Sequence, residues 1–174
     1  MKNVFRTSLI LAAALGLSAC ATYKTAIPEG YAGPTALLKD SSDVYSMSKA
    51  DIFYTLSVNG DEIDNARFAT RRANEGRGAI MAVQKVQRPI PAQPLKVGVS
   101  ARTVYAAPIM AMANTVYAVK GIVSFTPETG KTYVVRGKLS PTYSAVWIEE
   151  EASKSVVGEK IEIQGSAELG FFEK

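Results

Sequence analysis

Short stretches in which apolar and polar residues alternate run through most of this chain and constrain its fold more than any other feature. A period of two places every second side chain on the same face, as in a β-strand with one face on a core and the other in water. The stretches with this period are residues 52–58, 95–105, 117–125 and 133–139. In the first of them we expect one face to be buried, formed by Ile52, Tyr54, Leu56 and Val58, and the opposite face to be formed by Phe53, Thr55 and Ser57. In residues 95–105 we expect one face on the core, formed by Leu95, Val97, Val99 and Ala101, and the other in water, formed by Lys96, Gly98, Ser100 and Arg102.

Further segments complete a strand-rich pattern. Residues 143–148 and 156–163 flank a polar turn and predict a last hairpin, and Asn59-Gly60 is typical of a tight turn. Residues 80–87 predict another strand, at a sheet edge because prolines follow it. Only residues 65–75 favour a helix.

Seven or eight short strands, with turns about every ten residues and at most one short helix, predict a mainly β fold. We expect an antiparallel β-sandwich or a partly open barrel, formed by residues 35–165. Residues 20–34 contain prolines and glycines without apolar periodicity and predict a flexible tether. Residues 166–174 are expected to form a C-terminal tail.

The first nineteen residues have the layout of a secretory signal. Lys2 and Arg6 precede an apolar stretch that is too short to span a bilayer, and small residues close it. The run Leu17-Ser18-Ala19-Cys20 resembles the lipobox of bacterial lipoproteins. The alternative is an ordinary cleaved signal in which Cys20 is incidental.

The resemblance to bacterial lipoproteins implies the chemistry of this end of the chain. It implies cleavage between Ala19 and Cys20, acyl chains on Cys20, and a lipid-anchored location in the outer membrane, facing the periplasm. Two or more acyl chains make such an anchor stable. The strand pattern of residues 36–163 is also similar to small immunoglobulin-like or transthyretin-like sandwich domains of surface lipoproteins, many without assigned function.

The chain contains no histidine and one cysteine, Cys20. This composition excludes a Ser-His-Asp triad, a Cys-His pair and a zinc site of the usual ligands. Because the lone cysteine belongs to the lipobox, no disulfide is expected and stability must come from packing. We therefore predict a protein that is not an enzyme and that holds no metal and no cofactor.

Three short motifs suggest chemistry but have simpler explanations. Gly130-Lys131-Thr132 lacks the first glycine of a phosphate-binding loop and lies between strands, which favours a hairpin turn. Residues 46–49 match a Ser-x-x-Lys pattern without its companion motifs, which favours a polar loop. The acids of residues 61–64 and 149–151 are typical of solvated turns, although a carboxylate-pair hydrolase of envelope glycan is kept as an alternative.

Basic residues gather in one part of the chain. Residues 65–102 contain eight Lys and Arg against the single acid Glu75, whereas residues 140–174 contain seven acids against three bases. Removing Lys2 and Arg6 from the 20 basic residues leaves 18 against 16 acids, a net charge of only +2. The candidate anion-binding residues are Arg67, Arg71, Arg72, Arg77, Arg88 and Arg102.

Such a patch near a membrane could bind an anionic glycan, an anionic lipid or an acidic envelope protein. Nucleic acid is not expected in that compartment. The alternative is that strand alternation scatters these charges over several surfaces. Contiguous placement of the arginines would favour the binding hypothesis.

Residues 106–113 are unusually apolar for a loop, and Pro108 disfavours a central strand there. If buried, the segment would close one end of the core; if exposed, its methionines are typical of a docking surface. Phe171 and Phe172 could likewise be buried against the core or exposed as part of a docking surface. The sequence thus predicts a membrane-anchored structural or interaction module of the cell envelope.

Overall fold

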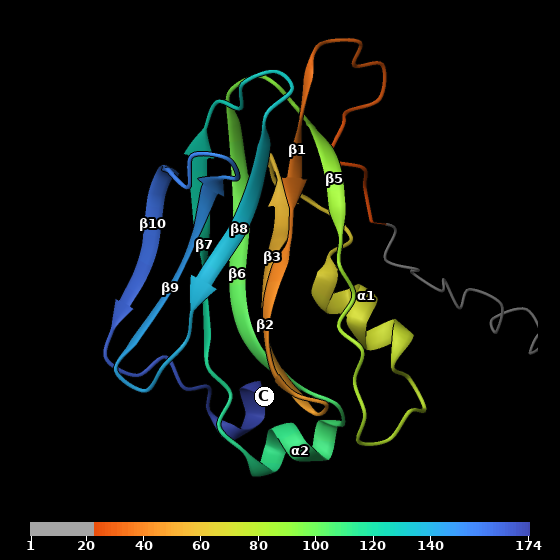
Figure 1. The fold of residues 1–174 in the computed structure, drawn as a ribbon, viewed down its shortest axis with the longest axis vertical. Helices are drawn as coiled ribbons and strands as arrows, with labels where there is room; N and C mark the ends of the chain where they lie inside the picture. The colour runs from red at the N-terminus through yellow and green to blue at the C-terminus, as the bar shows by residue number, and fades with distance from the viewer. Residues whose placement is uncertain (1–22) are drawn as a thin grey trace, which may run out of the picture.

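Two five-stranded sheets pack face to face in residues 23–174, the part of the chain that the computed structural model describes (Figure 1). Sheet I has the strand order β10-β9-β8-β1-β5, and sheet II has the order β2-β3-β6-β7 with β4 paired to β3. The strands are β1 (Thr35–Lys39), β2 (Ser41–Ser46), β3 (Lys49–Val58), β4 (Asp61–Glu62), β5 (Gln87–Pro91), β6 (Leu95–Tyr105), β7 (Ala118–Phe125), β8 (Thr132–Lys138), β9 (Tyr143–Glu150) and β10 (Val156–Gln164). The predicted mainly β, sandwich-like fold is confirmed, while Ala19 and Cys20 lie outside the described residues.

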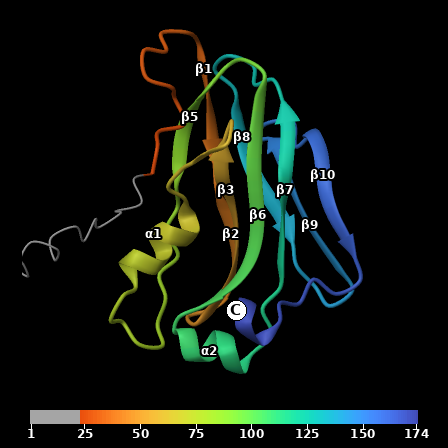
Figure 2. The same cartoon turned by 180° about the vertical axis from the view of Figure 1, so that it is seen from behind.

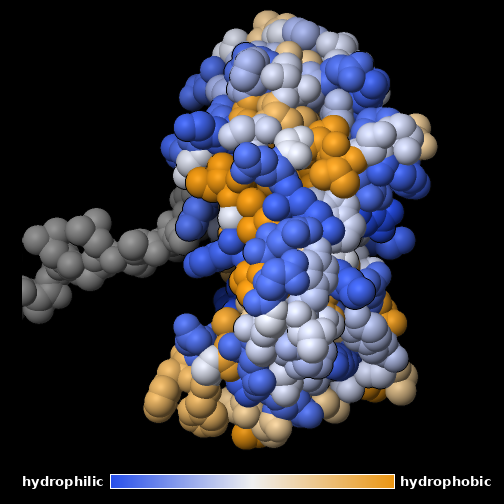
Figure 3. Space-filling view, turned by 90° about the vertical axis from the view of Figure 1, so that its left-hand side faces the viewer, coloured by the Kyte–Doolittle hydropathy of each residue, from blue (hydrophilic) through white to orange (hydrophobic). Residues whose placement is uncertain are grey.

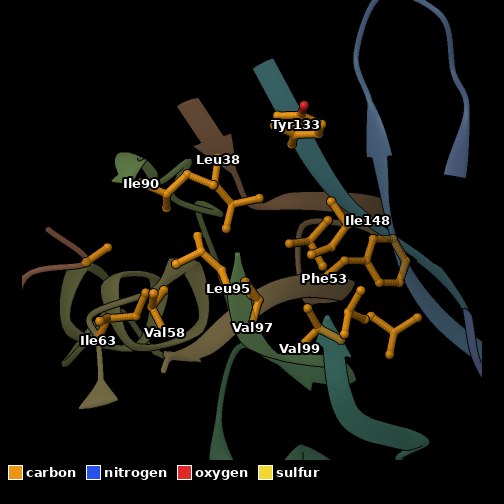
Figure 4. Packing of buried hydrophobic residues seen from close by; sticks show 14 of the residues in the cluster. Leu38, Phe53, Val58, Ile63, Ile90, Leu95, Val97, Val99, Tyr133 and Ile148 are labelled. Atoms are coloured by element: carbon orange, nitrogen blue, oxygen red, sulfur yellow. The ribbon is translucent and has the colours of Figure 1, made fainter. Parts of the chain in front are cut away.

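The core lies between the two sheets and is built by the alternating residues of the strands. Figure 4 shows Leu38 from sheet I and Phe53, Val97 and Val99 from sheet II pointing into this space. The buried face of β6 follows the sequence pattern, because Leu95, Val97 and Val99 all belong to the main core. One pairing departs from the antiparallel prediction, since β1 and β8 run parallel.

Strand β3 differs from its predicted pattern. Phe53, which the alternation places on the water-facing side, is buried in the main core. Ile52 and Tyr54 are buried on the opposite face, together with Ala66. A β-bulge between Thr55 and Ser57 shifts the register, and a bulge changes which face the following side chains occupy. Because Phe53 is buried on one face of β3 and Ile52 and Tyr54 are buried on the other, both faces of the strand are covered.

Helix α1 (Ala66–Ala73) lies over the outer face of sheet II and confirms the predicted helix (Figure 2). It begins after Asn65, whose side chain accepts hydrogen bonds from the amides of Arg67 and Phe68. An asparagine in this position satisfies amides that the first turn leaves free. The sequence did not predict α2 (Pro108–Ala113) or the single turn η1 (Phe171–Glu173). The helices of residues 23–174 are each too short or too polar to span a membrane.

The strand predicted at residues 80–87 is wrong, because β5 begins only at Gln87. Side chains of α1 and its C-cap take the backbone hydrogen bonds that a neighbouring strand would make. Asn74 bonds both the amide and the carbonyl of Ala82, and the Thr70 hydroxyl accepts from the amide of Gln84. Residues 80–86 consequently run beside α1. The edge position of β5, with its prolines, agrees with the prediction.

The segment before β1 lies against the domain. Lys24 forms a bridge with Ile63, its amide donates to the carbonyl of Glu62, and Ala26 is buried in the main core. The predicted tether spanned residues 20–34. From Tyr23 onward the chain makes these contacts, so a free tether is shorter than the sequence suggested.

Candidate functional site

A groove of about 620 Å³ opens on the outer face of sheet II. Figure 2 shows this face, with α1 on one side of β3, β6 and β7 and the C-terminal segment at its lower end. Charged side chains reach the groove from different elements: Arg67 from α1, Arg102 from β6 and Lys120 from β7. Leu169 and Glu173 line it from the C-terminal segment.

Strand register places the residues on the floor of the groove. Tyr54 of β3 pairs with Ser100 of β6, and Ser100 pairs with Lys120 of β7. These three residues form one row across the sheet, and Arg102 and Ala118 pair in the next row of β6 and β7. Because Ser100 and Ala118 are small, the sheet surface is hollow between the larger side chains.

The two arginines of the groove lie close enough to affect one another. Partial burial lowers the pKa of Arg102, and the positive charge of Arg67 lowers it further. One Nη atom of Arg102 donates to the carbonyl oxygen of Glu173 at 2.9 Å. Guanidinium groups present five donors, so this bond leaves most of them for a ligand. An anion between the two arginines would offset their repulsion.

Tyr54 adds a neutral donor to this groove. Tyr54 is 2% exposed as a residue and lines the groove. Within residues 23–174 the buried side-chain oxygen without a partner is that of Ser144 and not that of Tyr54, so the Tyr54 hydroxyl reaches the solvent of the groove. There it can donate to an acceptor such as a phosphate or carboxylate oxygen.

The predicted arginines separate into three groups. Arg67 and Arg102 share the groove. Arg88 is buried with its guanidinium on the carboxylate of Asp40, at 2.8 Å for each of two bonds, and is not available to a ligand. Arg71, Arg72 and Arg77 are exposed on α1 and the turn after it, and Arg72 pairs with Asp64.

Sequence reasoning found the groove arginines by charge but missed Tyr54, Ser100 and Lys120. The alternation of β6 does assign Ser100 and Arg102 to its outer face. Ser100 and Arg102 lie beside Tyr54 and Lys120 because of the register between neighbouring strands. The alternation of residues within one strand does not predict that register.

The clustered acids do not form a paired site. Glu149 bonds Arg136 at 3.0 Å, Glu150 accepts the amides of a turn, and Glu151 pairs with Lys39. Glu62 and Glu173 do line the groove, but both are exposed. Acid catalysis by two carboxylates depends on different environments for the two groups. Because Glu62 and Glu173 are both exposed to solvent, their environments are alike in this respect.

The two short motifs of the sequence lie in turns. Residues 46–49 form the tip of the β2–β3 hairpin. Gly130 has a φ of 74° and turns the chain between β7 in sheet II and β8 in sheet I. The predicted hairpin is therefore wrong in detail, because these strands do not pair. No helix follows Lys131, as a phosphate-binding loop would need.

A second group of residues, two of them with shifted pKa values, lies where β2, β3 and β6 are side by side. Asp51 accepts from Tyr45 at 2.9 Å and from Thr103 at 2.7 Å. Burial raises the pKa of Asp51, and burial together with Asp51 raises the pKa of Tyr45 to about 12. Neither residue lines the groove. We interpret these hydrogen bonds as structural, because they connect three neighbouring strands.

Apolar side chains gather at one end of the molecule, which forms the foot of Figure 3. We name this surface the exposed apolar end; its members are Met47, Ile109, Met112, Phe171 and Phe172. Backbone bonds join its parts, since the amide of Ala106 donates to Ser48 at 3.0 Å. None of the residues of α2 is buried, so the exposed alternative for residues 106–113 holds.

No group of three or more acidic or cysteine side chains within residues 23–174 could hold a metal ion. Comparisons of the chain with models of protein families, with curated proteins and with solved structures find no match.

Proposed function

We propose that this chain is a bacterial lipoprotein, anchored in the outer membrane through acyl chains on Cys20 and facing the periplasm, that binds an anionic ligand and is not an enzyme. The observation that carries the binding proposal is the placement of Arg67, Arg102 and Tyr54 around one groove. The lipobox carries the anchoring proposal.

The groove suits a ligand with one anionic group on a less polar body. Two guanidinium groups and a phenol donate hydrogen bonds to phosphate or carboxylate oxygens, and guanidinium is well matched to both. Leu56 and Leu169 line the same groove and offer apolar contact. Phosphorylated lipids and acidic envelope glycans share this chemistry.

Replacing Arg102 by Ala is expected to weaken anion binding by tenfold or more. A hydrogen bond to a charged group contributes about 1.5–3 kcal/mol, and about 1.4 kcal/mol corresponds to a factor of ten in affinity. Titration calorimetry with inorganic phosphate and with glucuronate measures the effect and distinguishes the two anion types. Tyr54→Phe should weaken the same binding by a smaller factor, because it removes only the neutral donor.

Lys154→Ala is the matched control, since Lys154 lies in the β9–β10 turn and does not line the groove. It should bind both anions like the unmodified chain. Equal affinity of the Arg102→Ala variant and the unmodified chain would contradict the proposal. So would failure of the unmodified chain to bind either anion.

Replacing Cys20 by Ala is expected to release the protein from membranes. The acyl chains contribute about 0.8 kcal/mol for each buried methylene, and the substitution removes the sulfur to which they attach. Fractionation of cells measures retention, and mass spectrometry of the native chain measures the added acyl mass and the loss of residues 1–19. Unchanged membrane retention of the variant, or an unmodified Cys20 in the native chain, would refute the anchor.

An envelope protein is a second candidate partner, favoured by one observation. Ile109 is 69% exposed and Phe172 is 98% exposed at the exposed apolar end. Apolar surface of this kind, with methionines that adapt to different shapes, is typical of protein docking sites. This function is compatible with the groove, because the two surfaces use different residues.

A further inference from the structure

Helix α1 and the segment that runs beside it carry a concentrated positive charge. Residues 66–86 contain five basic residues and one acid, Glu75. We name the exposed part the basic edge, and its members are Arg71, Arg72, Arg77 and Lys85. Of these, Arg72 pairs with Asp64. The bonds of Thr70 and Asn74 to residues 82–84 hold the segment against the helix. The basic edge is therefore made by the helix and by the segment that is bonded to it.

Two exposed apolar side chains adjoin the basic edge. Ile80 is 58% exposed and Met47 is 71% exposed. The amide of Met81 donates to the carbonyl of Met47 at 2.7 Å, which places the hairpin tip beside the turn that follows α1. Cationic side chains next to protruding apolar ones are typical of surfaces that lie in the interface of a membrane.

The described chain begins at this same side of the molecule. The ring of Tyr23 packs on Phe68 of α1, with centroids 5.2 Å apart, and both views show the start of the chain near α1 (Figures 1 and 2). Two residues, Ala21 and Thr22, lie between Cys20 and Tyr23. The three residue steps from Cys20 to Tyr23 span only about 10 Å when fully extended.

Charge and chain length together indicate what covers the basic edge. An acyl anchor at Cys20 would hold the membrane surface within about 10 Å of Tyr23, which is close to the screening length of about 8 Å at physiological ionic strength. Basic side chains near a membrane surface are attracted to its anionic headgroups. We propose that the basic edge lies on the anionic phospholipid surface of the membrane that holds Cys20, and so orients the domain.

This inference rests on the proposed anchor for its orientation, but the surface can be tested without it. Residues 23–174 contain both sheets and the whole described core. The test therefore uses residues 20–174 with Cys20→Ser, which cannot be acylated at that position. Cell fractionation and mass spectrometry then test the acyl anchor, and vesicle binding by the non-acylated chain tests the basic edge.

The measurement is sedimentation with vesicles of phosphatidylcholine alone or mixed with phosphatidylglycerol, at low and high ionic strength. We expect binding to the mixed vesicles at low ionic strength, and its loss in high salt and with phosphatidylcholine alone. The Arg71→Glu/Arg77→Glu variant should bind more than about tenfold more weakly, because two attractive charges become repulsive. Thermal unfolding checks that this variant is folded.

The control variant is Lys138→Glu/Lys154→Glu, which changes the net charge equally on exposed residues of sheet I and its β9–β10 turn. It should retain most of the binding. Equal losses in the two variants would overturn the proposal, because net charge alone would then explain the binding. No binding to the mixed vesicles would also overturn it.

Vesicle binding by an Arg102→Ala variant shows whether the basic edge or the groove contacts the lipid. If the groove captures single headgroups, this variant should lose vesicle binding as strongly as Arg71→Glu/Arg77→Glu, and the basic edge would then be the wrong surface. If Arg102→Ala binds vesicles nearly as well as the parent chain, the basic edge makes the contact.

Discussion

Replacing Asp40 by Ala is expected to lower the free energy of unfolding by about 3–5 kcal/mol, as is typical when one partner of a buried ion pair is removed. The side chain of Asp40 is 0% exposed and that of Arg88 is 10% exposed. Without the carboxylate, the bond that residues 23–174 still offer to the buried guanidinium of Arg88 is one of 3.2 Å to the carbonyl of Asp64. Urea denaturation followed by circular dichroism measures the loss.

The size of this effect follows from the number of groups that Asp40 joins. Its carboxylate accepts both bonds from Arg88, two from Thr55 through the amide and the hydroxyl, and one from the amide of Ala66. These partners lie in β5, β3 and the first turn of α1. Negative charge there also favours the helix N-terminus. One residue thus connects sheet I, sheet II and the helix that borders the groove.

Removal of Arg88 provides the comparison. In Arg88→Met the carboxylate of Asp40 keeps the donors of Thr55 and Ala66, so we expect a smaller loss than in Asp40→Ala. The double variant Asp40→Ala/Arg88→Met should be more stable than the sum of the single losses predicts, because no unpaired charge remains buried. Equal losses for the two single variants, or strict additivity, would contradict this account.

The sequence predicts β6 well and β3 poorly for a physical reason. One face of β6 packs on the core, while its outer face carries Ser100 and Arg102, so apolar and polar residues alternate. Both faces of β3 are covered, one by sheet I and the other by α1 and residues 80–86. Alternation then carries no signal, and the assignment of Phe53 to the water-facing side was wrong.

Partners that are distant in sequence explain the other errors. Residues 80–86 have the composition of a strand, but the backbone of Ala82 and Gln84 makes its hydrogen bonds with the side chains of Asn74 and Thr70. Arg88 has the charge of a binding residue, but its partner Asp40 lies 48 residues earlier in the chain. The arginine count therefore predicts a basic region, and only the register of β3, β6 and β7 identifies the groove within it.

Replacing Phe53 by Ala is expected to cost about 3–5 kcal/mol, the usual loss for a large aromatic residue truncated in a core. Phe53 is 2% exposed and points from β3 toward sheet I (Figure 4). Its ring lies over Gly137 of β8. A Cβ atom added at Gly137 would lie 2.5 Å from Cδ1 of Phe53 and 2.8 Å from the carbonyl oxygen of Ala145. The two sheets therefore approach closely at this point.

Gly137→Ala should by itself cost about 1–3 kcal/mol through overpacking. In the Phe53→Ala background the same substitution should cost less, because the ring that it meets is gone, although the contact with Ala145 remains. We expect a coupling of about 1 kcal/mol, measured by urea denaturation of the four chains in a double-mutant cycle. Ile90→Ala, in edge strand β5, is the control partner for Gly137→Ala, and this pair should be additive. Additivity for Phe53 and Gly137 as well would mean that the ring is not what requires glycine at position 137.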